Sequence, residues 1–146
     1  MKNMRNRIRR TAQQGVMLIE ALIGILIFSI GILALLGMQA LAIKTTTDAR
    51  YRSEAAFLIN QVTSQMWVDT ANIANYTTAT GYAPRDNWNT SVERTLPGVN
   101  IAGGVNVPTI TSVAGNQYTV TVFWLQPGEV QQRQLQMIYR INCATC

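Results

Sequence analysis

The sequence predicts an α+β protein in which one long N-terminal helix is followed by an antiparallel β-sheet. The helix is indicated by the stretch from Val16 to Trp67, which contains no proline and has apolar residues at helical spacing in its second half. The sheet is indicated near the C-terminus, where β-branched, aromatic and polar residues alternate on both sides of Pro127-Gly128. The 146 residues leave room for one modest domain with its own core.

An apolar run occupies the first half of the predicted helix. From Ala21 to Met38 the only polar side chain among eighteen residues is Ser29, so the run is long and apolar enough to span a membrane. Two simpler interpretations remain open. One is a plain single-pass anchor, and the other is a conventional signal peptide cleaved at Ala40-Leu41-Ala42, although the apolar region of such signals is usually shorter, about 7–15 residues.

The positive charge of the chain is confined to its start. The sequence has 12 Lys and Arg residues against 7 Asp and Glu residues, for a net charge of +5. Five of the basic residues lie within the first ten positions and no acidic residue precedes Glu20, so the chain from Val16 onward is balanced. A basic start before an apolar run is typical of a targeting segment, because positive residues stay on the cytoplasmic side. The other interpretation, an arm that binds nucleic acid, is disfavoured because the arm has no aromatic residue on which a base could stack.

The residue types argue against catalysis. The chain has no histidine, which removes the commonest general base and metal ligand. The carboxylates lack calcium-loop spacing, and Gly103-Gly104 lacks the flanking pattern of a phosphate loop. Thr119 and Thr121 fit the solvent face of a strand better than a catalytic pair. We therefore expect no enzymatic activity, no cofactor, no metal, no nucleic-acid partner and no small-molecule substrate.

Glu20 is the one unusual charge. It lies at the entrance to the apolar run, with no basic residue near it on the apolar side. A carboxylate costs about 2.5–3.5 kcal/mol at the centre of a bilayer and less near the interface. Either Glu20 reaches back to the lipid headgroups, or a cation is supplied by processing of the chain or by a partner.

The stretch GVMLIE, residues 15–20, together with the basic start, resembles the class III leader site of type IV pilins and pseudopilins. The resemblance implies that prepilin peptidase cleaves between Gly15 and Val16 on the cytoplasmic side, and that the new Val16 amine is N-methylated. Glu20 would become the fifth residue of the mature protein. Its carboxylate would pair with the amine of a neighbouring subunit in the filament and set subunit register, which explains a costly charge in an apolar helix.

Within this family the chain is most similar to the PilV-type minor pilins. The segments that look like that group are LIEALIGILIFSIGILALLGMQ (18–39), RSEAA (52–56) leading to Met66-Trp67, Trp88 with Leu96-Pro97-Gly98, and YTVTVFW (118–124). Many major pilins have a proline where Gly37 stands, and glycine still weakens a helix by about 1 kcal/mol relative to alanine. The resemblance implies the type IV pilin fold, with the second half of the long helix packed on the sheet.

The implied function is that of a minor pilin in a type IV pilus, or fimbrium, with pilus-linked cell adhesion and twitching motility. It would join other minor pilins and the major pilin in a priming or tip complex that promotes pilus assembly, with a tip adhesin as a further partner. Two alternatives stay open. A minor pseudopilin of type II secretion shares the leader, the helix and Glu20, whereas a membrane-anchored periplasmic binding module predicts no cleavage after Gly15.

This interpretation divides the chain into three parts. Residues 1–15 are the leader peptide, and residues 16–43 are the transmembrane and filament-core helix. Residues 44–146 are a periplasmic globular domain that includes the second half of the helix. We expect a single-pass inner-membrane precursor with a periplasmic C-terminal domain, and then a mature subunit in the pilus at the cell surface.

The elements of the globular domain follow from pattern alone. The second half of the helix has one apolar face, which consists of Ala55, Leu58, Ile59, Val62 and Met66. Ordinary packing against a core explains this face, so we assign no binding site to it. We expect the helix to end near Asn72 and a linker to run from about Thr70 to Pro84. One short helical turn from Asp86 to Arg94 would pack Trp88. Strands are expected at 105–113 and 117–125, followed by a return strand on which Leu135, Met137, Tyr139 and Ile141 alternate with polar residues.

The two cysteines form a C-x-x-C pair, Cys143 and Cys146. A redox-active pair normally needs a helix N-terminus, and a metal site needs two further ligands. A disulfide formed in an oxidising periplasm is therefore the favoured interpretation of the three. It would close a very small loop and stabilise the fold by about 2 kcal/mol or less.

Overall fold

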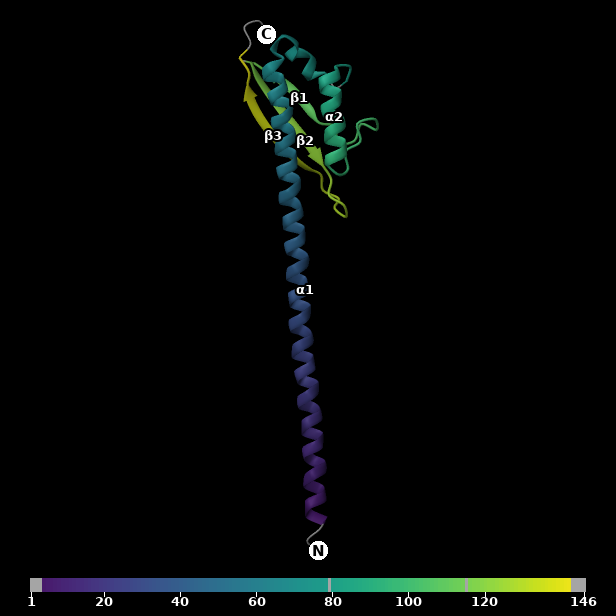
Figure 1. Cartoon of the computed structure of the whole chain (residues 1–146). Coiled ribbons are helices and arrows are strands. Elements are labelled where there is room, and N and C mark those ends of the chain that lie inside the picture. The colour runs from purple at the N-terminus through teal and green to yellow at the C-terminus, as the bar shows by residue number, and fades with distance from the viewer. Residues whose placement is uncertain (1–3, 79, 115, 143–146) are drawn as a thin grey trace. The chain divides into compact units, whose positions relative to one another are not determined.

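The computed structural model describes residues 4–78, 80–114 and 116–142, with side chains from residue 15 onward. The chain divides into two compact units, one up to Thr46 and one from Thr47 onward. The elements, labelled in Figure 1, are α1 (Met4–Val68), the 3-10 helix η1 (Thr70–Thr77), α2 (Ala83–Thr95), β1 (Thr109–Val113), β2 (Gln117–Trp124) and β3 (Arg133–Arg140). A long apolar helix and an antiparallel sheet make this an α+β protein.

The first unit consists of α1 up to Thr46. The hydroxyl of Ser29 donates a hydrogen bond to the Ile25 carbonyl at 2.7 Å, and those of Thr45 and Thr46 donate to the Ala42 carbonyl at 2.9 and 2.8 Å. Each hydroxyl therefore has a hydrogen-bond acceptor within its own helix. These residues can lie in apolar surroundings without an unsatisfied polar group. The segment Gly15–Val68 is long and apolar enough to cross a membrane by its length and composition, and its most apolar window is not buried within the chain.

The sheet of the second unit is an antiparallel meander in the order β1-β2-β3. β2 pairs with β3 without interruption from Gln117 opposite Arg140 to Trp124 opposite Arg133. Between them the Glu129 amide donates to the Gln126 carbonyl at 3.0 Å, and Gly128 has a φ of +81°. Proline at the second position and a left-handed glycine at the third define a type II turn, which confirms the turn expected at Pro127-Gly128.

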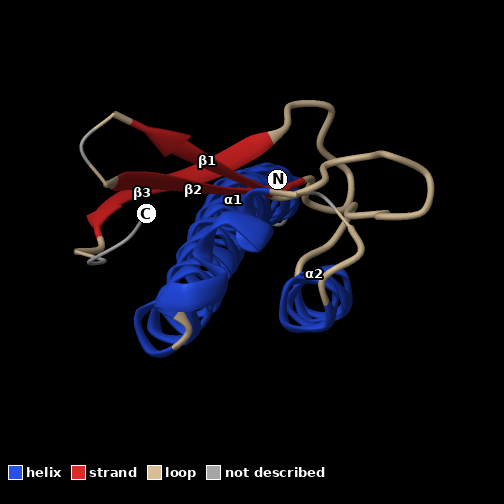
Figure 2. Ribbon diagram, turned by 90° about the horizontal axis from the view of Figure 1, so that it is seen from above, coloured by secondary structure: helices blue, strands red, loops and turns tan. Residues whose placement is uncertain are grey.

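The core of this unit lies between the sheet and its helices. Figure 2 shows the helices on one face of the sheet. All five residues of the predicted apolar face of α1 are buried, which confirms that face as the centre of the core: Ala55, Leu58, Ile59, Val62 and Met66. Trp88 of α2 is also buried, and its indole nitrogen donates to the Leu58 carbonyl at 2.7 Å. This bond fastens α2 to α1 while satisfying a buried donor.

Several element boundaries differ from the prediction. α1 ends at Val68, because Asp69 leaves the helical region with φ −110° and ψ 48°, and η1 occupies much of the expected linker. α2 is a complete helix rather than one turn. Pro84 lies in its first turn, where the missing amide costs nothing, and the helix ends at Thr95, with the extended residue Leu96 between it and Pro97. β1 begins at Thr109 and not at residue 105.

The two threonines of β2 do not face open solvent. Thr119 and Thr121 are both buried, although they alternate with the core residues Val120 and Val122. β2 is the central strand, so side chains of β1 and β3 cover its second face from both sides. The alternation of the strand was predicted correctly, but the exposure of these threonines was wrong.

Candidate functional site

The residues expected to be processed lie on the exposed surface of α1 in the first unit. A Cβ atom placed on Gly15 would meet nothing within 4 Å, and the side chain of Val16 is 66% exposed. The helix runs through both residues, so the peptide bond that joins them is helical. Glycine is a weak helix former, which lowers the cost of opening the backbone at this bond.

Glu20 lies one helical turn after Val16, on the same face of α1. Its side chain is exposed, and it forms no ion pair with the residues that the structure describes. Cleavage after Gly15 would make Val16 the first residue of the helix and would place Glu20 near its new N-terminus. A carboxylate there is favoured by the helix dipole and by the positive charge of the amine. The geometry therefore supplies a carboxylate that lacks a cation, next to a position where processing would create one.

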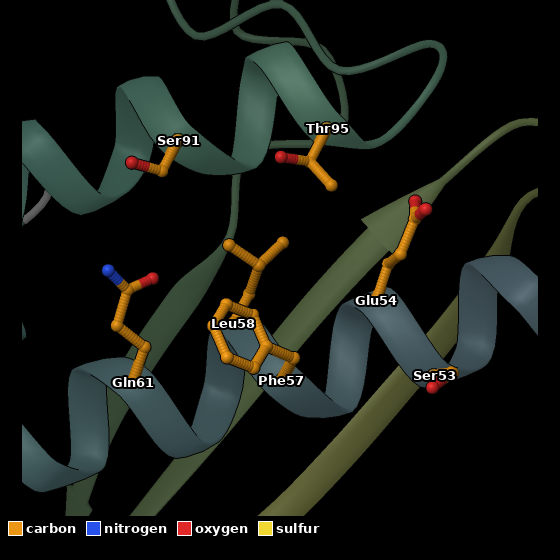
Figure 3. Close-up of a pocket in the computed structure, with 7 residues that line it drawn as sticks. All are labelled: Ser53, Glu54, Phe57, Leu58, Gln61, Ser91 and Thr95. Atoms are coloured by element: carbon orange, nitrogen blue, oxygen red, sulfur yellow. The ribbon is translucent and has the colours of Figure 1, made fainter.

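A groove of about 520 Å³ opens in the second unit between α1 and α2. Figure 3 shows Leu58 directed toward α2, with Ser91 and Thr95 on the facing helix. The seven residues that line the groove are Ser53, Glu54, Phe57, Leu58, Gln61, Ser91 and Thr95. Glu54 accepts a hydrogen bond from Arg50 at 2.8 Å, and Ser91 donates to the Asn87 carbonyl at 3.0 Å. The groove thus offers apolar contact from Phe57 and Leu58, and two of its polar groups already have partners within their own helices.

A cluster around Asp69 closes the end of α1. The Asp69 carboxylate accepts hydrogen bonds from the Tyr82 hydroxyl, from the Asn72 amide at 2.8 Å and from the Tyr76 hydroxyl at 3.3 Å. The bonds from Tyr82 and Asn72 are the main reason that the pKa of Asp69 is lowered. The rings of Tyr76 and Tyr82 meet edge to face at 5.1 Å. The cluster ties η1 and the start of α2 to the residue at which α1 ends.

Arg85 is a buried cation in α2. Its guanidinium lies 4.5 Å from the centre of the Trp88 ring and donates from Nη2 to the Pro108 carbonyl at 2.7 Å. Nε and Nη1 are buried without a hydrogen-bond partner. Burial lowers the pKa of Arg85 to about 10, and nearby Asp86 opposes that shift. The side chain links α2 to the residue before β1, so its role in this unit is positional.

A second polar network centres on Asp48. Oδ1 of Asp48 accepts from Gln126 at 2.8 Å and pairs with Arg133 at 3.3 Å, and Oδ2 pairs with Arg52 at 3.2 Å. Arg133 also pairs with Glu129 at 3.2 Å. The network connects the β2–β3 turn to the part of α1 that opens the second unit. Several linked charges hold a loop more firmly than one exposed pair does.

The structure describes some of the predicted site residues and not others. Gly15, Val16 and Glu20 lie together on α1, whereas Cys143 and Cys146 lie outside the described residues. Sequence reasoning missed the Asp48, Asp69 and Arg85 interactions, since each includes a bond to a residue thirteen or more positions away. Comparisons with protein-family models, with curated proteins and with solved structures found no match. The functional assignment therefore rests on the residues of this chain.

Proposed function

We propose that this chain is a minor pilin of PilV type with the type IV pilin fold. Prepilin peptidase would cleave it in the inner membrane, and it would then join other minor pilins and the major pilin in a complex that primes pilus assembly. The observation that carries the proposal is the segment Gly15–Glu20. It stands on an exposed helix directly before an apolar stretch, and its carboxylate has no counter-ion among the described residues.

Three further features support the proposal. α1 is long, apolar and unburied in its first unit, as a subunit needs if its helix passes from a membrane into a filament. In the second unit the same helix packs one face against an antiparallel sheet. The charge outside the leader is balanced, so removal of the basic N-terminal segment would leave a neutral subunit. The C-terminal domain would lie in the periplasm and later at the cell surface, where a tip adhesin is a further partner.

Mass spectrometry of the mature N-terminus tests the proposal. We expect the chain purified from its native membrane to begin at N-methylated Val16. Gly15→Val should leave the full precursor uncleaved because the larger side chain blocks the approach of the protease to the backbone. Gly24→Val, further along the same exposed helix, serves as the control and should be processed normally. An intact leader, or a mature chain that begins at Ile43, would overturn the proposal in favour of an anchored module or a conventional signal peptide.

Glu20→Gln tests the pairing role. This variant keeps the size of the side chain and removes its charge, so membrane insertion and cleavage should be unchanged while co-purification with sheared pili should fall. The control is Ser29→Ala, which alters a polar residue of the same helix whose hydroxyl is already bonded to Ile25. Normal incorporation of Glu20→Gln would exclude the pairing role. Co-purification with a secretion pseudopilus in place of the pilus would identify the type II secretion alternative.

A further inference from the structure

The two edges of the sheet differ in what covers them. β1 lies close to η1 as well as to β2. β3 has β2 along one side, and no other described element lies along its backbone. Figure 1 shows β3 at the side of the sheet away from α2. Because alternate residues of an antiparallel strand direct both backbone groups away from the partner, half of the β3 residues present unpaired amides and carbonyls at this edge.

Between its terminal arginines, the β3 edge lacks three features that commonly protect such an edge. Its pairing with β2 continues through all eight residues without a bulge, and the strand contains no proline and no lysine. Natural proteins commonly use those three devices to prevent strand addition. Its side chains alternate between half-buried residues that rest on the core, namely Leu135, Met137 and Tyr139, and exposed ones. The hydroxyl of Tyr139 donates to Asn60 of α1 at 2.8 Å, which fastens this strand at its edge position.

Charge at this edge indicates the chemistry of a partner. The sheet contains two charged residues, Arg133 and Arg140. Arg133 is neutralised by Asp48 and Glu129, whereas Arg140 is exposed and has no ion pair with any described residue. On the same face as Arg140, Ile138 is 64% exposed. An added strand that carried an acidic residue opposite Arg140 and an apolar residue beside Ile138 would complement both.

We propose that the free edge of β3 is a docking site for an extended acidic segment of another protein, which adds to the sheet as a further strand. Backbone hydrogen bonds supply the affinity in this mode of recognition, and alternate side chains supply the specificity. A second copy of this chain fits less well, because β3 has no acidic residue and two paired β3 strands would leave both Arg140 side chains uncompensated. The proposal concerns the second unit alone and does not require the chain to enter a filament.

A synthetic strand tests the proposal on the full chain in detergent micelles. The probe is a fluorescent peptide of alternating valine and threonine with a glutamate at each end, and its binding is measured by anisotropy. We expect it to bind about fivefold more tightly than the same peptide with terminal lysines, from one cross-strand charge pair. Arg140→Glu should reverse that preference. Arg94→Glu, an exposed charge at the end of α2, is the matched control and should leave it unchanged.

Backbone methylation separates strand addition from general adhesion. One peptide is N-methylated at its valines and another at its threonines, so only one of the two can still donate hydrogen bonds to β3. We expect one version to bind at least about tenfold more weakly than the parent and the other to bind as well as the parent. Equal binding by both versions, or no binding of the parent peptide, would overturn the proposal. Self-association of the chain through β3 that the peptide does not displace would also overturn it, in favour of a second copy.

Discussion

α1 contains two stretches of one helix that meet different surroundings. Between Val16 and Ile43 the large apolar side chains are exposed on every face of the helix. Between Thr47 and Val68 one apolar face is buried, and the other faces carry mostly charged and polar residues, with Phe57, Trp67 and Val68 exposed among them. The same backbone therefore serves two purposes, and the distribution of side chains around the helix decides which. An all-round apolar surface needs lipid or other helices around it, whereas a single apolar face needs one packed layer, which the sheet and α2 supply here.

The largest expected difference comes from one substitution made in both stretches. Ile59 is fully buried and Ile27 is 65% exposed. Ile59→Ala should lower the free energy of unfolding of the second unit by about 3 kcal/mol, because it removes buried methyl groups and leaves a cavity. Ile27→Ala should leave it unchanged. Denaturant unfolding in micelles, followed by tryptophan fluorescence, measures both, and equal effects would show that the two stretches are not distinct.

Glycine substitutions should have opposite signs in the two units. Gly98 has a φ of +74°, and a Cβ there would lie 2.7 Å from the Cβ of Leu125, so Gly98→Ala should destabilise the second unit by about 2 kcal/mol. Gly31 in α1 has open space around it, and Gly31→Ala should stabilise the helix locally by about 1 kcal/mol. Denaturant midpoints report the first effect, and slower amide exchange near residue 31 reports the second. Stabilisation by Gly98→Ala would contradict the close contact.

A smaller effect should come from the hydrogen bond between the helices. Trp88→Phe retains an aromatic ring but removes the indole hydrogen bond to the Leu58 carbonyl, so we expect a loss of about 1 kcal/mol. Trp67→Phe is the control, since Trp67 is half exposed and lies at the end of the same α1 stretch. Thermal unfolding compares the two variants. A loss for Trp67→Phe as large as that for Trp88→Phe would mean that the buried bond contributes nothing specific.

The smallest effect concerns pH and the end of α1. Because hydrogen bonds lower the pKa of Asp69 in the folded protein, its contribution to stability is present above the unfolded pKa of about 3.8 and is lost as pH falls through the folded value. Asp69→Asn should therefore destabilise the chain at neutral pH and should reduce the steepness of acid unfolding. Tyr82→Phe, which removes the main donor, should act in the same direction. If the acid-unfolding curve of Asp69→Asn is identical to that of the unaltered chain, this role for Asp69 is excluded.

The sequence predicted most of the fold where the signal was periodic. The five-residue apolar face of α1, the turn at Pro127-Gly128 and the alternation of β3 all follow from local spacing, and the structure confirms them. The helix end was misplaced; the chain leaves the helix at Asp69, whose carboxylate accepts a hydrogen bond from Tyr82, thirteen positions later. The length of α2 was underestimated for a similar reason, since Trp88 holds this polar helix in place through its bond to Leu58 in α1.

The candidate processing site was recognised from the sequence alone. Gly15, Val16 and Glu20 are close in the chain, so their pattern is visible without a fold, and the structure adds that they lie exposed on one helix. The edge position of β3, by contrast, could not be predicted from the sequence. Its alternation is visible in the sequence, but no local signal tells which strand will lie at the edge of a sheet.

By itself, then, the sequence determined where most of the chain is helical, which stretch is apolar enough for a membrane, and that a carboxylate, Glu20, lies at the start of that stretch. These features depend on residue type and short-range spacing, and both can be read directly from the sequence. The tertiary structure alone decided that Thr119 and Thr121 are covered and that Asp48 holds the β2–β3 turn. It also decided that β1 lies close to η1, whereas β3 has only β2 beside it among the described elements. Those outcomes depend on which distant segments become neighbours, and packing of the core settles that choice.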